Sequence, residues 1–347
     1  MTRFWMKKQF WGTLFGLVLL TYCVKDIRFS ELESLLYRVN FYYLLAALVA
    51  GFLFVALKGL RWRLMISQQK RLTIQRVVTL YAAGQFLSIV MPALTGQVGR
   101  VMLFSRKEDL RKTYVFSTIV LEVLFDGISL IVFMFVTSLA FAFPSEYRYL
   151  SFVVAGSTVV ALVLLYLILH YQNGLENIAH RRLRARWPGV YITFKKFIRS
   201  FTKGIEMLRS SQHMFGTLAF SLASWTSHML VVWFLFLAFG LSLPFAAAAV
   251  VMIINTIVLM IPITPGNAGT FEVAVSTSLA AFSVGRSDAV LFALALHLVD
   301  LLPVFCFGYL FMYFEKLSLK EIKAVQEEDI ILEHIDEEGA FIEEEKV

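Results

Sequence analysis

Charged residues are scarce in this 347-residue sequence: Asp, Glu, Lys and Arg make up 16% of it, whereas hydrophobic types make up 59%. That balance excludes an ordinary soluble domain, in which about a quarter of the residues are charged. The apolar residues come in long unbroken runs, which are typical of bilayer spans. Because a helix satisfies its own backbone hydrogen bonds in lipid, we expect an all-α polytopic membrane protein.

Cysteines and metal-binding patterns are equally sparse. Cys23 and Cys306 both lie in apolar runs, so they offer no disulfide framework and no metal-ligand spacing. The sequence contains no P-loop, no nucleophile elbow and no Cys/His cluster, and it lacks a basic module with interleaved aromatics for RNA or DNA. We therefore expect no cofactor, no metal and no nucleic-acid partner, and we expect membrane lipids as the main partners.

Acidic residues are few before the C-terminal segment. From Glu327 onward the chain carries ten acids and one Lys, so the preceding 326 residues carry 31 basic and 15 acidic side chains. A basic membrane protein favours the anionic cytoplasmic leaflet. We interpret 1–315 as a single transmembrane domain and 316–347 as an acidic, partly disordered cytoplasmic tail.

Six apolar runs are long enough to cross, or nearly to cross, a hydrocarbon core of about 30 Å. They are residues 9–24, 41–60, 114–142, 150–170, 214–240 and 289–314. Basic residues precede the first run, follow the second and fill 171–213, which holds nine Lys or Arg against two Glu. The positive-inside bias places these segments and both termini in the cytoplasm of a bacterial-type inner membrane, and the loops at 25–40 and 143–149 outside.

Residues 190–208 predict an amphipathic helix. Apolar residues recur on one face from Val190 to Leu208, while Lys195 and Arg199 belong to the opposite, basic face. Such a helix lies in the membrane interface, here on the anionic cytoplasmic leaflet, or it packs against a partner protein.

Two segments do not fit simple spans. Residues 74–105 and 245–284 each contain two short apolar arms around a centre with Pro and Gly, which includes Pro92 in the first and Pro265 in the second. We expect two re-entrant helical hairpins that open from opposite faces of the membrane. Each segment could instead be two full spans, because a pair of spans would leave the basic loops and both termini on the same side. Interrupted helices that meet near the midplane are typical of transporters. The alternative is two Pro-kinked helix pairs with a packing role only.

Polar residues gather at the centre of the first hairpin. Gln85, Gln97 and Arg100 flank it, and an Arg there costs about 3 kcal/mol or more if it faces lipid. Its guanidinium suits bidentate capture of a phosphate. The alternative is that Arg100 snorkels to the membrane interface.

Two acids follow in the span 114–142. Glu122 and Asp126 lie one turn apart on one face of the helix, so they cannot both ionise cheaply. Either Arg61 and Arg100 neutralise them or one stays protonated. The pair is a proton relay or a cation site in the functional interpretations, and a structural ion pair otherwise.

The second hairpin contains the run PGNAGTFE, which ends at Glu272. Gly266, Asn267 and Gly269 allow close backbone approach, and the helix that begins there points free N–H groups at the tip, which makes an anion site. In the alternative interpretation, Glu272 itself caps those groups.

Further polar residues stand in apolar runs. His297 and Asp300 are expected to form a local hydrogen-bonded pair rather than a metal site, and His228 is a lone polar residue. No catalytic residue is predicted. The predicted substrate-binding residues are Arg61, Gln85, Gln97, Arg100, Glu122, Asp126, Asn255, Gly266, Asn267, Gly269 and Glu272.

Four motifs occur in the order GLRWRLMI, GQFLSIVMPALTGQVGRVMLFSR, LEVLFDG and PGNAGTFE. In this order they resemble the membrane domain of the lysylphosphatidylglycerol synthase family, the flippase-like half of the multiple peptide resistance factor proteins, over about residues 10–315. The chain departs from the family pattern at Gln97, where an acid is usual, at Val123, where Arg is typical, and at Asn267, where a second Gly is common.

The resemblance implies a lipid flippase or transporter that moves an anionic or aminoacylated phospholipid or a polyprenyl-linked lipid. In the full-length synthases a soluble C-terminal domain attaches an amino acid to phosphatidylglycerol, whereas here only 316–347 follow the last span, so we expect no such enzyme activity. The alternatives are a membrane-embedded lipid-headgroup transferase and a non-catalytic accessory subunit. A homo-oligomer and a separate lipid-modifying enzyme stay open as partners.

Overall fold

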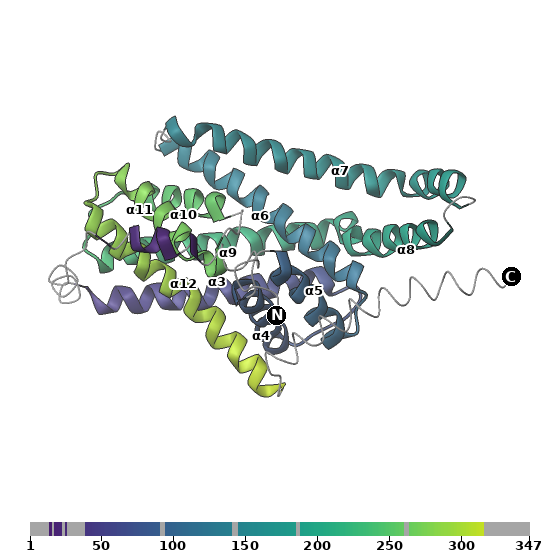
Figure 1. Cartoon of the computed structure of the whole chain (residues 1–347), viewed down its shortest axis with the longest axis horizontal. Helices are drawn as coiled ribbons and strands as arrows, with labels where there is room; N and C mark the ends of the chain where they lie inside the picture. The colour runs from purple at the N-terminus through teal and green to yellow at the C-terminus, as the bar shows by residue number, and fades with distance from the viewer. Residues whose placement is uncertain are drawn as a thin grey trace.

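The computed structural model describes residues 39–90, 94–140, 145–184, 188–259 and 264–315, together with short helical pieces between 14 and 25. Within these ranges every regular element is a helix, and the helices pack into one elongated bundle (Figure 1). The predicted all-α class is therefore confirmed.

Four helices are long and apolar enough to cross a bilayer. They are α3 (Phe41–Ile66), α6 (Lys112–Ala140), α9 (Ser211–Ala238) and α12 (Arg286–Phe314). Each contains 26 to 29 residues. At 1.5 Å per residue this gives a length of about 40 Å, which exceeds the hydrocarbon core. These helices correspond to four of the predicted spans.

The predicted span at 150–170 is helical as part of α7 (Ser145–Leu183). That helix bends at Tyr171, where φ is −104° and ψ is 16°, and its described apolar stretch covers 155–168. Because α7 begins at Ser145, the prediction of a loop over 143–149 is wrong from Ser145 onward, and residues 143 and 144 lie outside the described residues.

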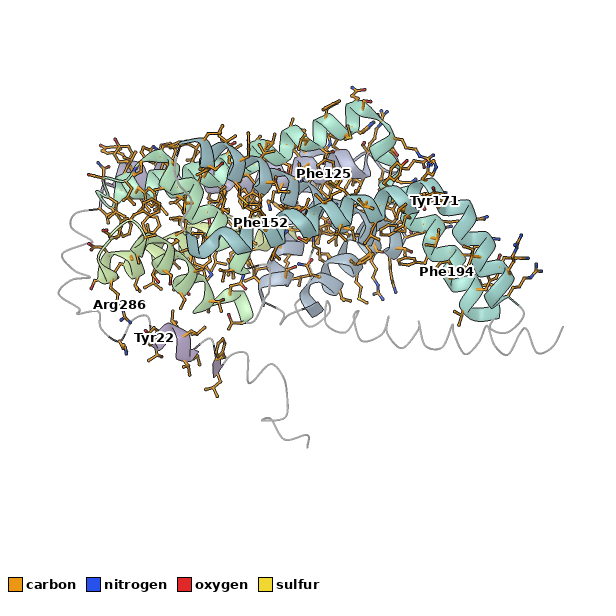
Figure 2. The ribbon with its side chains drawn as sticks, turned by 90° about the horizontal axis from the view of Figure 1, so that it is seen from above. Tyr22, Phe125, Phe152, Tyr171, Phe194 and Arg286 are labelled. Atoms are coloured by element: carbon orange, nitrogen blue, oxygen red, sulfur yellow. The ribbon has the colours of Figure 1, made fainter. Side chains whose placement is uncertain are left out.

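Half of the predicted span at 9–24 lies outside the described residues, and the described half, 14–15 and 17–22, is helical. Where the chain is described again, Tyr22 contacts the beginning of α12 (Figure 2). The Arg286 Nη2 atom donates a hydrogen bond to the Tyr22 carbonyl at 3.2 Å, and the guanidinium lies 5.1 Å from the centre of the Tyr22 ring.

Two pairs of short helices form the segments that do not fit simple spans. In the first pair α4 (Ile74–Val90) packs against α5 (Leu94–Glu108), and in the second α10 (Phe245–Leu259) packs against α11 (Thr270–Ala280). Figure 1 shows α10 and α11 at one end of the bundle and α4 and α5 toward the other end. The turn Pro265–Asn267, labelled η3, brings the second pair into contact with α4.

The predicted amphipathic helix is α8 (Pro188–Ile205), which continues as a short 3-10 turn. Ile198, Phe201 and Ile205 are buried because α8 packs against α6 and α7 of the same chain. Part of the apolar face is therefore covered within the chain, where α7 extends beyond the bundle and the chain returns as α8 (Figures 1 and 2). Val190 and Phe197 on the same helix are exposed, so contact of this helix with the membrane interface stays a prediction.

Ion pairs join the end of α12 to the first pair of short helices. Glu315, directly after α12, contacts Arg76 of α4 and lies 2.7 Å from Lys107 of α5. Glu108 in turn lies 2.8 Å from Arg76 and 3.2 Å from Lys70. These contacts fix where α4 and α5 begin and end relative to α12.

The Glu315 contacts predict a pH dependence of stability. The hydrogen bond from Lys107 lowers the pKa of Glu315 below its ordinary value of 4.5, and Arg76 adds to this effect. A carboxyl group with a lowered pKa stabilises the fold above its unfolded pKa, and that contribution is lost as the pH falls through the folded pKa. We expect Glu315→Gln to lower Tm modestly at neutral pH, and the Tm difference to disappear once the pH has fallen below the lowered folded pKa of Glu315. A Tm difference that grows on acidification contradicts this assignment.

Candidate functional site

Charged side chains gather inside the bundle, where α3, α5 and α6 meet. We name this group the interior charge cluster, and its members are Lys58, Arg61, Arg100, Glu122 and Asp126. Arg61, Arg100 and Glu122 are only 0%, 2% and 5% exposed. Charged groups this deeply buried persist only when they are paired and hydrogen-bonded.

Asp126 is held from three directions. The Arg61 Nη1 atom lies 2.5 Å from its Oδ1, and the Lys58 Nζ atom lies 3.3 Å from its Oδ2. The Trp225 Nε1 atom of α9 donates a hydrogen bond to Oδ1 at 2.8 Å. The Lys58 ammonium also lies 4.6 Å from the centre of the Trp225 ring and 4.9 Å from that of Phe54, within the range of cation–π attraction.

Glu122 occupies the other half of the cluster. Its Oε2 pairs with the Arg100 guanidinium, and its Oε1 lies 3.4 Å from Arg61 Nη2. The Tyr81 hydroxyl donates to Oε1 at 2.5 Å, and Gln85 Nε2 donates to the Tyr81 hydroxyl oxygen at 2.8 Å. Arg61 therefore bridges the two carboxylates, which lie one turn apart on α6.

The interior charge cluster carries a surplus of one positive charge, because three basic side chains face two carboxylates. The Nε atoms of Arg61 and Arg100 are buried and have no hydrogen-bond partner among the described residues. Surplus charge and unused guanidinium donors favour an anionic group with oxygen acceptors. In the described ranges no group of three His, Cys, Asp or Glu side chains is placed to hold a metal ion.

The structure brings together one set of the predicted residues. Arg61, Gln85, Arg100, Glu122 and Asp126 all belong to this cluster or hydrogen-bond to it. The prediction that basic partners neutralise the two acids is confirmed, and the alternative that Arg100 snorkels to the interface is wrong because that side chain is buried.

Two predicted residues lie elsewhere. Gln97 is exposed on the surface of α5 and is not part of the interior charge cluster. Asn255 is buried in α10, makes no bond to the interior charge cluster, and has a side-chain oxygen without a partner among the described residues.

A second group surrounds the turn before α11. Glu272 Oε2 accepts a hydrogen bond from the Gly269 N–H at 2.7 Å, so the carboxylate caps α11, as in the alternative interpretation of the sequence. Glu272 Oε1 lies 2.7 Å from Nδ1 of His297, whose Nε2 lies 3.0 Å from the Gly266 carbonyl oxygen. The His297 ring stacks on Phe271 with 4.2 Å between centroids. The helix terminus is therefore occupied by the chain's own carboxylate.

The backbone of this turn explains its composition. Gly266, Asn267 and Gly269 have φ values of 60°, 57° and 83°, a region that favours glycine and tolerates asparagine. A Cβ atom on Gly266 would lie 3.5 Å from a side-chain carbon of Ile89 in α4, which is ordinary van der Waals contact, so the positive φ and not crowding favours glycine here.

The predicted local pair of His297 and Asp300 is wrong. The two side chains leave α12 toward different neighbours, and Asp300 pairs with His228 of α9, whose Nε2 lies 3.1 Å from each carboxylate oxygen. The His228 ring stacks on Phe54 with 4.8 Å between centroids. Two separate His–carboxylate pairs result, one on each side of α12.

Sequence reasoning missed Lys58, Tyr81 and Trp225. Lys58 was detectable, because a charged residue three positions before Arg61 in an apolar helix shares a face with it. Tyr81 stands four residues before Gln85 and was detectable by the same argument. Trp225 gives no local signal, because its bond to Asp126 joins helices that are distant in sequence.

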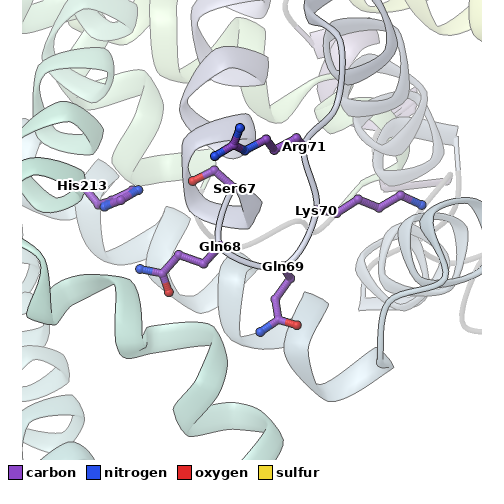
Figure 3. Close-up of a pocket in the computed structure, with 6 residues that line it drawn as sticks. All are labelled: Ser67, Gln68, Gln69, Lys70, Arg71 and His213. Carbon is purple, nitrogen blue, oxygen red and sulfur yellow. The ribbon is translucent and has the colours of Figure 1, made fainter.

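An open depression of about 590 Å³ lies at the end of α3 (Figure 3). It is lined by Ser67, Gln68, Gln69, Lys70, Arg71 and His213. The Arg71 guanidinium lies above Ser67 and contacts no acid within the described ranges, whereas Lys70 points away toward Glu108. Ser67 stands six positions after Arg61, which places the depression about 9 Å along the axis of α3 from the interior charge cluster.

Fold and site together define a polytopic helical membrane protein with a charged interior. Residues 9–308 match the family described as lysylphosphatidylglycerol synthase TM region, and this chain belongs to that family. The resemblance predicted from the four motifs is thus confirmed.

Two relatives are described as UPF0104 membrane proteins. The one from Methanocaldococcus jannaschii is 24% identical over 245 residues, which cover 69% of this chain and 98% of the relative. The one from Pyrococcus horikoshii is 22% identical over 277 residues, which cover 74% of this chain and 82% of the relative. No solved structure matches the chain.

Proposed function

We propose that this protein moves a lipid with an anionic headgroup between the leaflets of the cell membrane. The observation that carries the proposal is the surplus positive charge of the interior charge cluster, buried among helices long enough to span the bilayer. A phosphate group offsets that surplus and accepts the unused donors of Arg61 and Arg100. Anionic or aminoacylated phospholipids and polyprenyl-linked phosphates all present this group.

The short helix pairs support a route to the cluster that opens alternately from the two faces of the membrane. We interpret them as re-entrant hairpins, since α4–α5 and α10–α11 lie toward opposite ends of the bundle and meet where η3 contacts α4. That contact involves Ile89, one turn beyond Gln85, whose amide belongs to the hydrogen bonds of the cluster. The depression with Arg71 then gives a headgroup a basic approach from the end of α3.

Reconstitution into vesicles tests the proposal. Vesicles with fluorescent phosphatidylglycerol, phosphatidylcholine or a polyprenyl phosphate in one leaflet are exposed to a membrane-impermeant quencher. We expect the protein to speed quenching of an anionic lipid from the protected leaflet, with phosphatidylcholine slower and every lipid chemically unchanged. A new lipid species in the mass spectrum supports the headgroup transferase instead. Unchanged quenching for all three lipids supports the accessory subunit and contradicts transport of these classes.

The proposed orientation predicts the accessibility of introduced cysteines. In a background without Cys23 and Cys306, a cysteine at exposed Gln69 is expected to react only with reagent on the cytoplasmic side. A cysteine at exposed Asp288, where α12 begins, is expected to react only from outside. Labelling of both positions from one side of intact cells contradicts the assignment of α3 and α12 as spans that both begin outside and end in the cytoplasm.

A further inference from the structure

Both ring nitrogens of His297 face an oxygen, and this geometry locates a proton. Nε2 lies 3.0 Å from the Gly266 carbonyl oxygen, which only accepts, so Nε2 must carry a hydrogen. Nδ1 lies 2.7 Å from Glu272 Oε1. If Nδ1 carried no hydrogen and Glu272 were ionised, two hydrogen-bond acceptors would face each other at this distance. One further proton must therefore lie between His297 and Glu272.

The neighbouring pair, His228 and Asp300, needs no additional proton. His228 Nε2 lies 3.1 Å from both oxygens of Asp300, and its Nδ1 has no partner among the described residues. A neutral ring with its hydrogen on Nε2 satisfies that contact. Of the two pairs beside α12, the one with Glu272 therefore depends on an additional proton.

The proton holds the turn before α11 in place. His297 secures the Gly266 carbonyl, while Glu272 secures the Gly269 N–H at 2.7 Å. When the proton leaves, the 2.7 Å contact becomes repulsive, and the ring cannot leave Glu272 without losing the Gly266 carbonyl as well. The turn that contacts Ile89 of α4 is then released.

Other ionisable groups on the helices packed against α11 and α12 are bonded elsewhere. Those in α3, α4 and α9 that bond other groups are Lys58, Arg61, Arg63, Arg76, Tyr81, His213 and His228, and none of them bonds His297 or Glu272. Helix α10 (Phe245–Leu259) contains no ionisable side chain, and Asp300 on α12 pairs with His228.

We propose that His297 and Glu272 form a proton-binding site, and that its occupancy decides whether the 264–269 turn stays against α4. The bound species is a proton, and the responding element is the tip of the second pair of short helices. Coupling of this release to lipid movement rests on the proposed function, whereas the proton site itself does not.

A reporter cysteine tests the site without any lipid transport. Ala268→Cys, in a chain without Cys23 and Cys306, places a thiol in the turn, where Ala268 has an ordinary φ. Maleimide labelling of the folded protein is compared at about pH 5.5 and pH 8.5, which bracket the ordinary titration of histidine. Each rate is divided by that of the same chain unfolded in detergent at the same pH, because this ratio cancels ionisation of the thiol.

We expect the labelling ratio to rise about tenfold from the acidic to the alkaline condition, as for the loss of one charge-assisted hydrogen bond. Glu272→Gln should abolish the rise, because its amide supplies a permanent N–H to Nδ1 while its oxygen still accepts from Gly269. His228→Gln, the matched control, should keep the rise. A flat ratio in the parent reporter overturns the proposal whether or not Glu272→Gln folds, and so does a rise that only His228→Gln removes.

Discussion

Replacing Glu122 with Gln is expected to abolish lipid transport and to lower the free energy of unfolding by about 3–5 kcal/mol. The change leaves the 2%-exposed Arg100 without its carboxylate and raises the surplus positive charge of the interior charge cluster. Arg100→Gln should cause a loss of similar size, because it strands Glu122 instead. Denaturant unfolding in detergent and the vesicle assay measure the two effects.

The double variant Arg100→Gln/Glu122→Gln separates the effect of the ion pair on stability from the effect of the Arg100 charge on transport. It removes one charge of each sign, so it should recover most of the stability lost in either single variant. Transport should stay absent because the Arg100 guanidinium, which we propose binds the headgroup phosphate, is missing. Lys196→Gln is the matched control, because this exposed lysine of α8 changes the net charge outside the cluster. Its stability and transport should remain close to those of the unmodified protein. If the single variants are as stable as the control, the pairing of Arg100 with Glu122 is contradicted.

Gly96→Val is expected to destabilise the protein by about 1–3 kcal/mol or more and to abolish transport as well. A Cβ at this position would lie 2.6 Å from the Ser88 Cα and 3.0 Å from the Leu87 carbonyl oxygen, both atoms of the α4 backbone. The side chain therefore fits only if α4 and α5 separate. Because Arg100 stands one turn further along α5, the separation also withdraws its guanidinium from Glu122.

Gly156→Ala provides the control for the glycine prediction. A Cβ on Gly156 of α7 meets nothing within 4 Å, so the substitution adds no clash and removes a helix-weakening glycine. We expect unchanged or slightly higher stability and normal transport. Equal behaviour of the two glycine variants in unfolding and transport contradicts the close approach of α4 and α5.

The apolar runs predict the long helices well because span length and hydropathy are local properties of the sequence. The breaks in 74–105 and 245–284 are predictable for a related reason, since proline close to glycine in the middle of a short apolar run disfavours a continuous helix. The packing of α8 on α6 was not predictable, because an amphipathic face does not say which apolar surface covers it. That choice depends on how far α7 extends beyond the bundle.

The interior charge cluster was half predictable. The cost of charge in lipid requires partners for Glu122 and Asp126, and it points to Arg61 and Arg100 as the nearest candidates. Helical spacing alone misassigned His297 and Asp300, because i,i+3 side chains can face two different neighbours when a helix is surrounded on all sides. Such pairings are set by the tertiary arrangement of α9, α11 and α12.

Transport by the Arg100→Gln/Glu122→Gln double variant tests the central claim most directly, because the variant is expected to fold. The account predicts that purified double variant, with an unfolding midpoint near that of the unmodified protein, leaves quenching of fluorescent phosphatidylglycerol at the rate of protein-free vesicles. Lys196→Gln should reach the unmodified rate in the same experiment. A folded double variant that moves the lipid as fast as the unmodified protein contradicts the claim that the interior charge cluster binds the headgroup.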